Sequence, residues 1–164
     1  MKKPNSLRNH LLNAVPELKR DPDRILIHTE SGKIRCNGLT ALSFEYEYEL
    51  NLILREYSGD LDAVMIPLFD WITTNQNELL LNLDKSKDAF KYETIILSNN
   101  SVDLLLTMPL SERVIVKKND DGSITTTFPP EPQYEEILEP KNLKLLNSTG
   151  EVIAEWQSTS PHLG

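Results

Sequence analysis

The sequence predicts an α+β fold in which an antiparallel or mixed sheet with long strands packs against two helices. One observation is the alternation of apolar and polar residues over residues 42–57. A second is a similar alternation over residues 102–118, and a third is a pair of segments with apolar residues at helical spacing. Side chains alternate across a strand, whereas they recur every three to four residues on one face of a helix, so the two periods distinguish the elements.

The N-terminal segment predicts a short helix. Asn5 or Ser6 is placed to cap it, and Pro16 disfavours helical backbone at Val15, so the helix should end there. Its apolar face is formed by Leu7, Leu11, Ala14 and Val15.

The next segment predicts a hairpin of short strands. Residues 24–29 read as one strand, Ser31-Gly32 as a turn and residues 33–36 as the returning strand, with another turn at Asn37-Gly38.

Residues 42–57 predict the long central strand. One face carries Phe44, Tyr46, Tyr48, Leu50, Leu52 and Leu54. The opposite face is largely polar, so the strand should bury one side and expose the other.

Residues 60–75 predict a helix that kinks at Pro67, because its apolar stripe continues through the proline. Residues 75–82 read as a turn with three buried leucines. Strands are expected at 89–97 and 102–118, the first with Phe90, Tyr92, Thr94 and Ile96 on one face. Pro109 lies inside the second, which predicts an edge strand or a bulge there.

The C-terminal quarter has a different composition. We expect one domain over residues 1–128, closed by a hairpin around residues 119–122. Residues 129–140 are rich in proline and acid and read as an extended linker. Residues 141–157 predict a β-hairpin arm, followed by a flexible tail over 158–164. The arm is too apolar to be free, so it should pack on its own domain or on another chain.

Charge and composition exclude several classes. The net charge is −8, and residues 119–164, with two basic and eight acidic residues, carry −6 of it. No basic surface for gripping nucleic acid is evident, and we expect no sequence-specific binding to it. Cys36 is the single cysteine, so no intramolecular disulfide can form. No segment is apolar over the length that a membrane span needs.

Glu45, Glu47 and Glu49 form a row of carboxylates on one strand face, roughly 6.5–7 Å apart. This spacing resembles an acid/base pair, but no cleft motif accompanies it. A solvated face neutralised by cross-strand residues such as Lys91 is the favoured interpretation. The alternative is the wall of a wet cavity, or a lumen or inter-subunit surface, with which we group Arg55 and Arg113.

No motif indicates catalysis, a cofactor or a metal. The chain has no Gly-rich phosphate loop and no metal-ligand spacing, and His10, His28 and His162 lie far apart in the sequence. We therefore expect a protein that is not an enzyme and that needs no cofactor.

Several stretches together resemble the tail completion protein R family of contractile-tailed temperate phages. They are KPNSLRNHLLNAVPEL with PDRI, LSFEYEYELNLIL, YSGDLDAVMIPLFDWI, NELLLN and DLLLTMPLSERVIVK, in this order within residues 2–118. The resemblance implies a phage or prophage assembly protein of the virion tail, made in the host cytoplasm. It also implies similarity to tail terminators, which form a hexameric ring on the tube.

The partners that this resemblance implies are further copies of the chain as a homo-hexamer, the tail tube protein, and sheath and head–tail connector proteins. The alternative is a monomeric or dimeric adaptor or assembly chaperone that is absent from the virion. We hypothesise that the arm, through Leu143, Leu146, Val152, Ile153 and Trp156, docks on a neighbour. We also hypothesise that Glu45, Glu47 and Glu49 line a negative lumen through which DNA slides.

Overall fold

A computed structural model describes residues 1–36, 42–98, 100–133 and 139–158 of the chain. The helices are α1 (Lys3–Ala14), α2 (Pro16–Arg20), the 3-10 helix η1 (Pro22–Arg24), α3 (Asp62–Asn75), α4 (Glu78–Leu81) and α5 (Leu83–Ala89). The strands are β1 (Ile25–Cys36), β2 (Phe44–Tyr57), β3 (Lys91–Ile96), β4 (Val102–Lys118), β5 (Ile124–Thr127), β6 (Asn142–Leu146) and β7 (Val152–Gln157). The predicted α+β class is confirmed.

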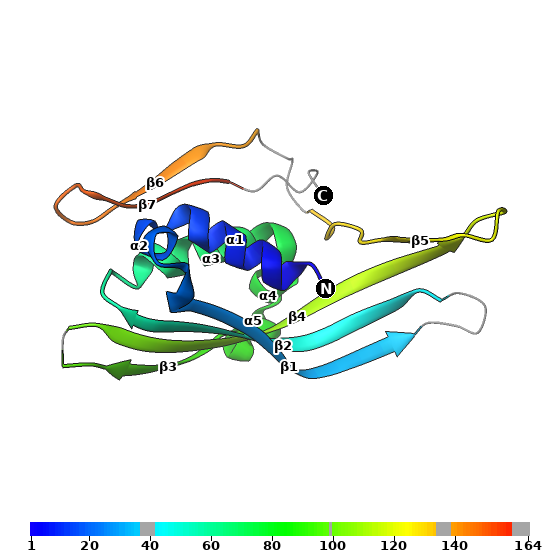
Figure 1. Ribbon diagram of the computed structural model, residues 1–164, viewed down its shortest axis with the longest axis horizontal. Helices are drawn as coiled ribbons and strands as arrows, with labels where there is room; N and C mark the ends of the chain where they lie inside the picture. The colour runs from blue at the N-terminus through cyan, green and yellow to red at the C-terminus, as the bar shows by residue number, and fades with distance from the viewer. Residues whose placement is uncertain (37–41, 99, 134–138, 159–164) are drawn as a thin grey trace.

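The molecule has three layers (Figure 1). The main sheet has the strand order β1-β2-β4-β3, β5 pairs with the far end of β4, and all of its pairs are antiparallel. Helices α1 and α3 cover one face of this sheet, and the β6-β7 hairpin lies on the other side of these helices. Because the hairpin contacts the helices rather than the sheet, the helix layer is covered on both sides.

Strand β2 confirms the alternation that was predicted for residues 42–57. Tyr48, Leu50, Leu52 and Leu54 are at most 5 % exposed and face the helices. We call this side of the sheet the core face and the opposite side the outer face. Burying these four side chains supplies roughly 1.5–3 kcal/mol each, which makes β2 the centre of the core.

Helix α1 begins earlier than predicted, and neither Asn5 nor Ser6 caps it. It starts at Lys3, with Pro4 in its first turn. Backbone amides in the first turn have no acceptor inside the helix, so a proline there costs no helical hydrogen bond. Val15 is extended, as expected before Pro16, but the chain then forms the short helix α2. Helix α3 continues through Pro67, as predicted. The turn expected at 75–82 instead contains α4 and leads into α5, short helices that the sequence did not indicate.

The predicted turn at Ser31-Gly32 is wrong. Strand β1 runs through it as one element, and its register against β2 shifts between Glu30 and Lys33. Ser31 has a φ of 51° in this bulge. A bulge and a hairpin turn use the same residue types, so local composition did not distinguish them. The turn expected at Asn37-Gly38 lies outside the described residues.

Strand β3 forms as predicted, with Tyr92, Thr94 and Ile96 on one face, but this face is exposed. Tyr92, Ile95 and Ile96 are 70 %, 64 % and 82 % exposed. Tyr92 and Ile96 do point to the core face, opposite Leu106 and Val102, but β3 is the outer strand of the sheet. Within the described residues, the helices bury the β4 side chains of this face and leave those of β3 open.

Strand β4 is neither an edge strand nor bulged at Pro109, because it lies between β2 and β3 and its register with β2 is continuous there. In the described residues, Pro109 instead lies in a short stretch of β4 that is unpaired on the side away from β2. Along β4, pairing with β3 extends as far as Thr107, and pairing with β5 starts at Ile115. In the gap between them, the Ser111 amide donates to Gln76 Oε1 over 3.1 Å. Amides two residues apart point to the same edge, so a proline at 109 leaves no amide unpaired there.

The C-terminal hairpin forms as predicted. Ala154 is fully buried and Trp156 is 9 % exposed, against α1 and α3 of the same chain. The linker expected over 129–140 begins with residues that bond to the domain, as described below. Residues 134–138 of this linker and 159–164 of the expected tail lie outside the described residues.

Candidate functional site

The acidic row lies on the outer face and is partly neutralised. The Arg35 guanidinium is 2.7 Å from a Glu47 carboxylate oxygen. Glu45 lies in register between Arg35 on β1 and Arg113 on β4. Lys33 on β1 lies opposite Glu47. The basic neighbours are therefore Lys33 and these two arginines and not Lys91, which pairs with Thr107.

Glu49 differs from the other two glutamates. It is exposed, and in register it lies between Glu30 and Pro109, so no basic residue is directly opposite. Arg55, which we grouped with this surface, is also exposed and lies six residues further along β2, roughly 20 Å away. The structure thus brings Arg113 to the acidic row but not Arg55.

A cleft of about 980 Å³ opens beside the row. Its walls come from β1, β2 and β4, from α4 and α5, and from residues 131–132. The charged residues that line it are Lys33, Arg35, Glu45, Glu47, Glu49, Glu78, Asp84, Asp88, Arg113 and Glu131. Acidic side chains outnumber basic ones, so the cleft suits a positively charged or polar surface better than an anion.

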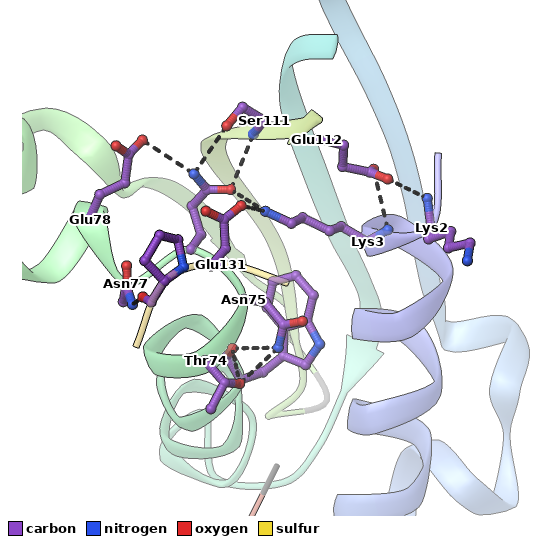
Figure 2. A network of polar contacts seen from close by, with 12 residues as sticks. Lys2, Lys3, Thr74, Asn75, Asn77, Glu78, Ser111, Glu112 and Glu131 are labelled. Carbon is purple, nitrogen blue, oxygen red and sulfur yellow. Dashed lines mark hydrogen bonds and ion pairs between the residues drawn. The ribbon is translucent and has the colours of Figure 1, made fainter. Parts of the chain in front are cut away.

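Glu112 anchors the start of α1 from the core face of β4 (Figure 2). It is 3 % exposed, and its carboxylate accepts hydrogen bonds from the backbone amides of Lys2 and Lys3 over 2.6 and 3.2 Å. The Tyr48 hydroxyl donates to the same carboxylate over 2.5 Å. Burial and the adjacent Glu112 raise the pKa of Tyr48. The carboxylate satisfies amides that have no partner inside the helix and lies at the positive end of its dipole.

Lys3 joins this anchor to the start of the predicted linker. Its ammonium donates to Gln76 Oε1 over 2.7 Å and to Glu131 Oε1 over 2.6 Å. Burial lowers the pKa of Lys3, and the Glu131 carboxylate opposes that shift. The Asn77 amide donates to the Pro132 carbonyl over 2.6 Å, and Figure 2 shows how these groups converge at the end of α3.

Sequence reasoning missed Glu112 and its network, although one signal was present. Position 112 is in phase with Leu104, Leu106, Met108 and Leu110, whose side chains the alternation assigns to the buried face. A carboxylate in that phase must find donors, because an unpaired buried charge is costly.

The arm residues divide into two sets. Trp156 Nε1 donates to the Asp70 carboxylate over 2.9 Å, and Leu143 and Ile153 pack against the core. Leu146 and Val152 are 54 % and 46 % exposed near the hairpin tip. Docking of this hairpin on a neighbour stays a prediction.

In the part of the chain that the structure describes, no group of three or more His, Cys, Asp or Glu side chains is arranged to hold a metal ion. Over the same residues, no helix has both the length and the apolar character of a membrane span.

Comparison with known proteins identifies relatives. Residues 1–132 match the family described as P2 phage tail completion protein R (GpR). The chain is also 31 % identical over 156 residues to "Tail completion protein R" of Escherichia phage P2, which covers 95 % of this chain and 99 % of that protein. The similarity therefore extends beyond residue 118, where the stretches that carry the resemblance end. No solved structure matches the chain. Because the family match spans most of the sequence, the chain belongs to the P2 phage tail completion protein R family.

Proposed function

We propose that this protein completes a contractile phage tail by forming a ring on the end of the tail tube, which stops tube growth and prepares the tail for head joining. Membership of the tail completion protein R family carries the proposal. The role is structural rather than enzymatic, and the partners are further copies of the chain, the tube protein, and sheath and connector proteins. Assembly takes place in the host cytoplasm, also when the gene is expressed from a prophage.

Two features of the fold support a ring. Among the residues that the structure describes, the outer strands β1 and β3 leave both edges of the path β1-β2-β4-β3 available for pairing, and the two edges differ in sequence. Contact between different surfaces of identical subunits generates closed rings when the rotation closes. A hexamer is the expected number by similarity to tail terminators.

Imaging and complementation test the proposal. Negative-stain images of the purified protein should show rings of tube diameter, and antibody should detect the protein at one end of purified tails. A phage that lacks the protein should produce tubes of uncontrolled length or tails that do not join heads. Uniform, head-competent tails without the protein contradict the proposal.

An adaptor or chaperone is the second candidate, because the acidic cleft suits transient binding of a basic surface. It would remain monomeric or dimeric and be absent from purified tails. Detection at the tail end by antibody therefore separates the two functions.

Glu49 tests the lumen hypothesis, because its charge has no basic residue directly opposite. If the row lines a channel, Glu49→Lys should retain DNA and lower the yield of infectious particles, while Glu139→Lys should not. Equal yields from the two variants contradict a lumen at this face.

The arm is tested by truncation. Deleting residues 139–164 removes the hairpin but keeps Glu131 and Pro132 in place. If the hairpin docks on a neighbour, the truncated protein should lose mass as an oligomer in light scattering. An unchanged oligomer that still enters tails contradicts this role.

A further inference from the structure

Strand β3 presents an unpaired edge with exposed apolar side chains. Tyr92, Ile95 and Ile96 are all more than 60 % exposed, and in the described part of the chain β3 pairs only with β4. An exposed apolar edge strand is a template for pairing with another strand.

The apolar surface continues onto α3. Ile66 and Phe69, three residues apart on that helix, are 41 % and 38 % exposed. The Phe69 ring contacts the Phe90 ring edge-on, with 5.2 Å between their centroids. Since Phe90 directly precedes β3, the exposed side chains of helix and strand belong to one continuous surface.

The unpaired stretch of β4 differs from the β3 edge, because its backbone amides are removed or bonded. Where β4 is unpaired, Pro109 removes one amide and Gln76 accepts from the Ser111 amide. No proline occurs in β3, and its six exposed residues include three large apolar side chains together with the charged Lys91 and Glu93. This difference between the β4 and β3 edges indicates that a partner strand covers the β3 edge.

We infer that β3 of one subunit pairs with residues 25–30 of β1 in the next subunit, which extends the sheet around the ring. The inference rests on the proposed ring and names its interface. Every neighbour in the path β1-β2-β4-β3 is antiparallel, so β3 and β1 run in opposite directions. Two copies in the same orientation therefore meet as an antiparallel pair.

Length and side-chain chemistry select the register. β3 has six residues, and the regular part of β1 before its bulge, residues 25–30, also has six. If core faces align, Lys91 lies opposite Glu30, Glu93 opposite His28 and Ile95 opposite Leu26 on the outer face. On the core face, Tyr92 lies opposite Thr29, Thr94 opposite Ile27 and Ile96 opposite Ile25. Each outer-face contact thus joins complementary groups.

Other registers are poorer. Slipping by one residue exchanges the two faces, so the nearest alternatives are slips of two. One places Glu93 opposite Glu30 and Lys91 opposite Gly32 in the bulge. The other places Glu93 opposite Leu26. Both lose the contact between the Lys91 ammonium and the Glu30 carboxylate.

Cysteine cross-linking tests the pairing. In a Cys36→Ser background, His28→Cys and Glu93→Cys should form intermolecular disulfides, because paired antiparallel residues have suitable Cα separations. Mild oxidation of the purified protein and of assembled tails should give a ladder of covalent multimers that ends at the ring number. Each single-cysteine variant should give none, and Lys33→Cys with Glu93→Cys is the off-register control.

Charge exchange tests the register independently. Lys91→Glu and Glu30→Lys should each weaken association by roughly 2- to 30-fold per interface, and the double variant should restore it. Lys117→Glu makes the same charge change on the part of β4 that pairs with β5, so it should leave association unchanged. Sedimentation velocity provides the measurement.

The outcomes separate the interface from the ring. Rings without cross-linking, or with full association of both charge variants, overturn the β3–β1 interface and leave the proposed function standing. Dimers from Glu93→Cys alone indicate β3–β3 pairing and also overturn the inference. If neither the purified protein nor assembled tails show cross-linking or a ring, the β3–β1 interface and the proposed function are both overturned.

Discussion

Glu112 should be a major determinant of stability, and Glu112→Gln is the substitution that isolates its charge. The side chain keeps its volume, but one carboxylate oxygen becomes an amide group that donates rather than accepts. The wild-type carboxylate accepts from the amides of Lys2 and Lys3 and from the Tyr48 hydroxyl. At least one of these donors therefore loses its acceptor.

The expected loss follows from the number and kind of these bonds. A hydrogen bond to a charged group contributes about 1.5–3 kcal/mol, and a charge near a partly buried helix terminus contributes up to about 2 kcal/mol. We expect Glu112→Gln to lower the free energy of unfolding by about 2–4 kcal/mol. For a domain of this size, that corresponds to a fall in Tm of roughly 4–16 °C.

Thermal and urea unfolding followed by circular dichroism measure the effect. Glu49→Gln is the matched control, because Glu49 is an exposed glutamate in the same sheet and its loss should change stability by less than about 0.5 kcal/mol. Tyr48→Phe completes a double-mutant cycle, in which a coupling of about 0.5–3 kcal/mol with Glu112→Gln is expected. A Glu112→Gln protein that melts together with the Glu49→Gln control refutes the assigned role.

Three further predictions concern the helices, a turn and the hairpin. Trp156→Ala should undock β7 at a cost of about 3–5 kcal/mol, seen as faster amide hydrogen exchange in residues 142–157 while β2 stays protected. Burial lowers the pKa of His10 from its usual 6.5. Below pH 6.5 the unfolded chain therefore binds more protons than the folded chain, and the free energy of unfolding falls as the pH drops. His10→Gln should reduce this dependence on pH, which urea unfolding at several pH values measures. Gly59→Ala should cost about 1–3 kcal/mol, because an added Cβ would lie 2.6 Å from the buried Tyr57 hydroxyl, whereas Gly32→Ala meets nothing within 4 Å and serves as its control. Equal melting of the two alanine variants would contradict the close approach.

The sequence predicted those elements whose pattern is long and whose partners are near in the chain. The alternation over residues 42–57 spans enough positions to define both the strand and its buried face. Proline at 109 marked a stretch of β4 that is unpaired on one side in the described residues, although β4 is neither an edge strand nor bulged there. In each case the physical requirement, burial of one face or absence of an amide, is carried by the residue itself.

Features that depend on distant residues were not predictable in the same way. Gln76 and Glu131 meet Lys3 from positions 73 and 128 residues away, and none of the three has a local signature. Short helices such as α4 draw their stability from packing rather than from propensity, so the leucines there read as a turn. For the candidate surface, the row of glutamates was visible, whereas its pairing with Arg35 depended on the bulge that sets the register of β1.

The exposure of β3 is informative about assembly. Its alternation places Tyr92 and Ile96 on one face, which is the core face of the sheet, yet both are exposed in the single chain. Pattern and exposure agree if the covering layer comes from another copy. In each subunit α1 packs over β1, so a neighbour whose β1 joins β3 brings its own α1 to the same side as these two residues. The pattern of β3 then describes the assembled ring, in the same way that the pattern of β2 describes the folded subunit.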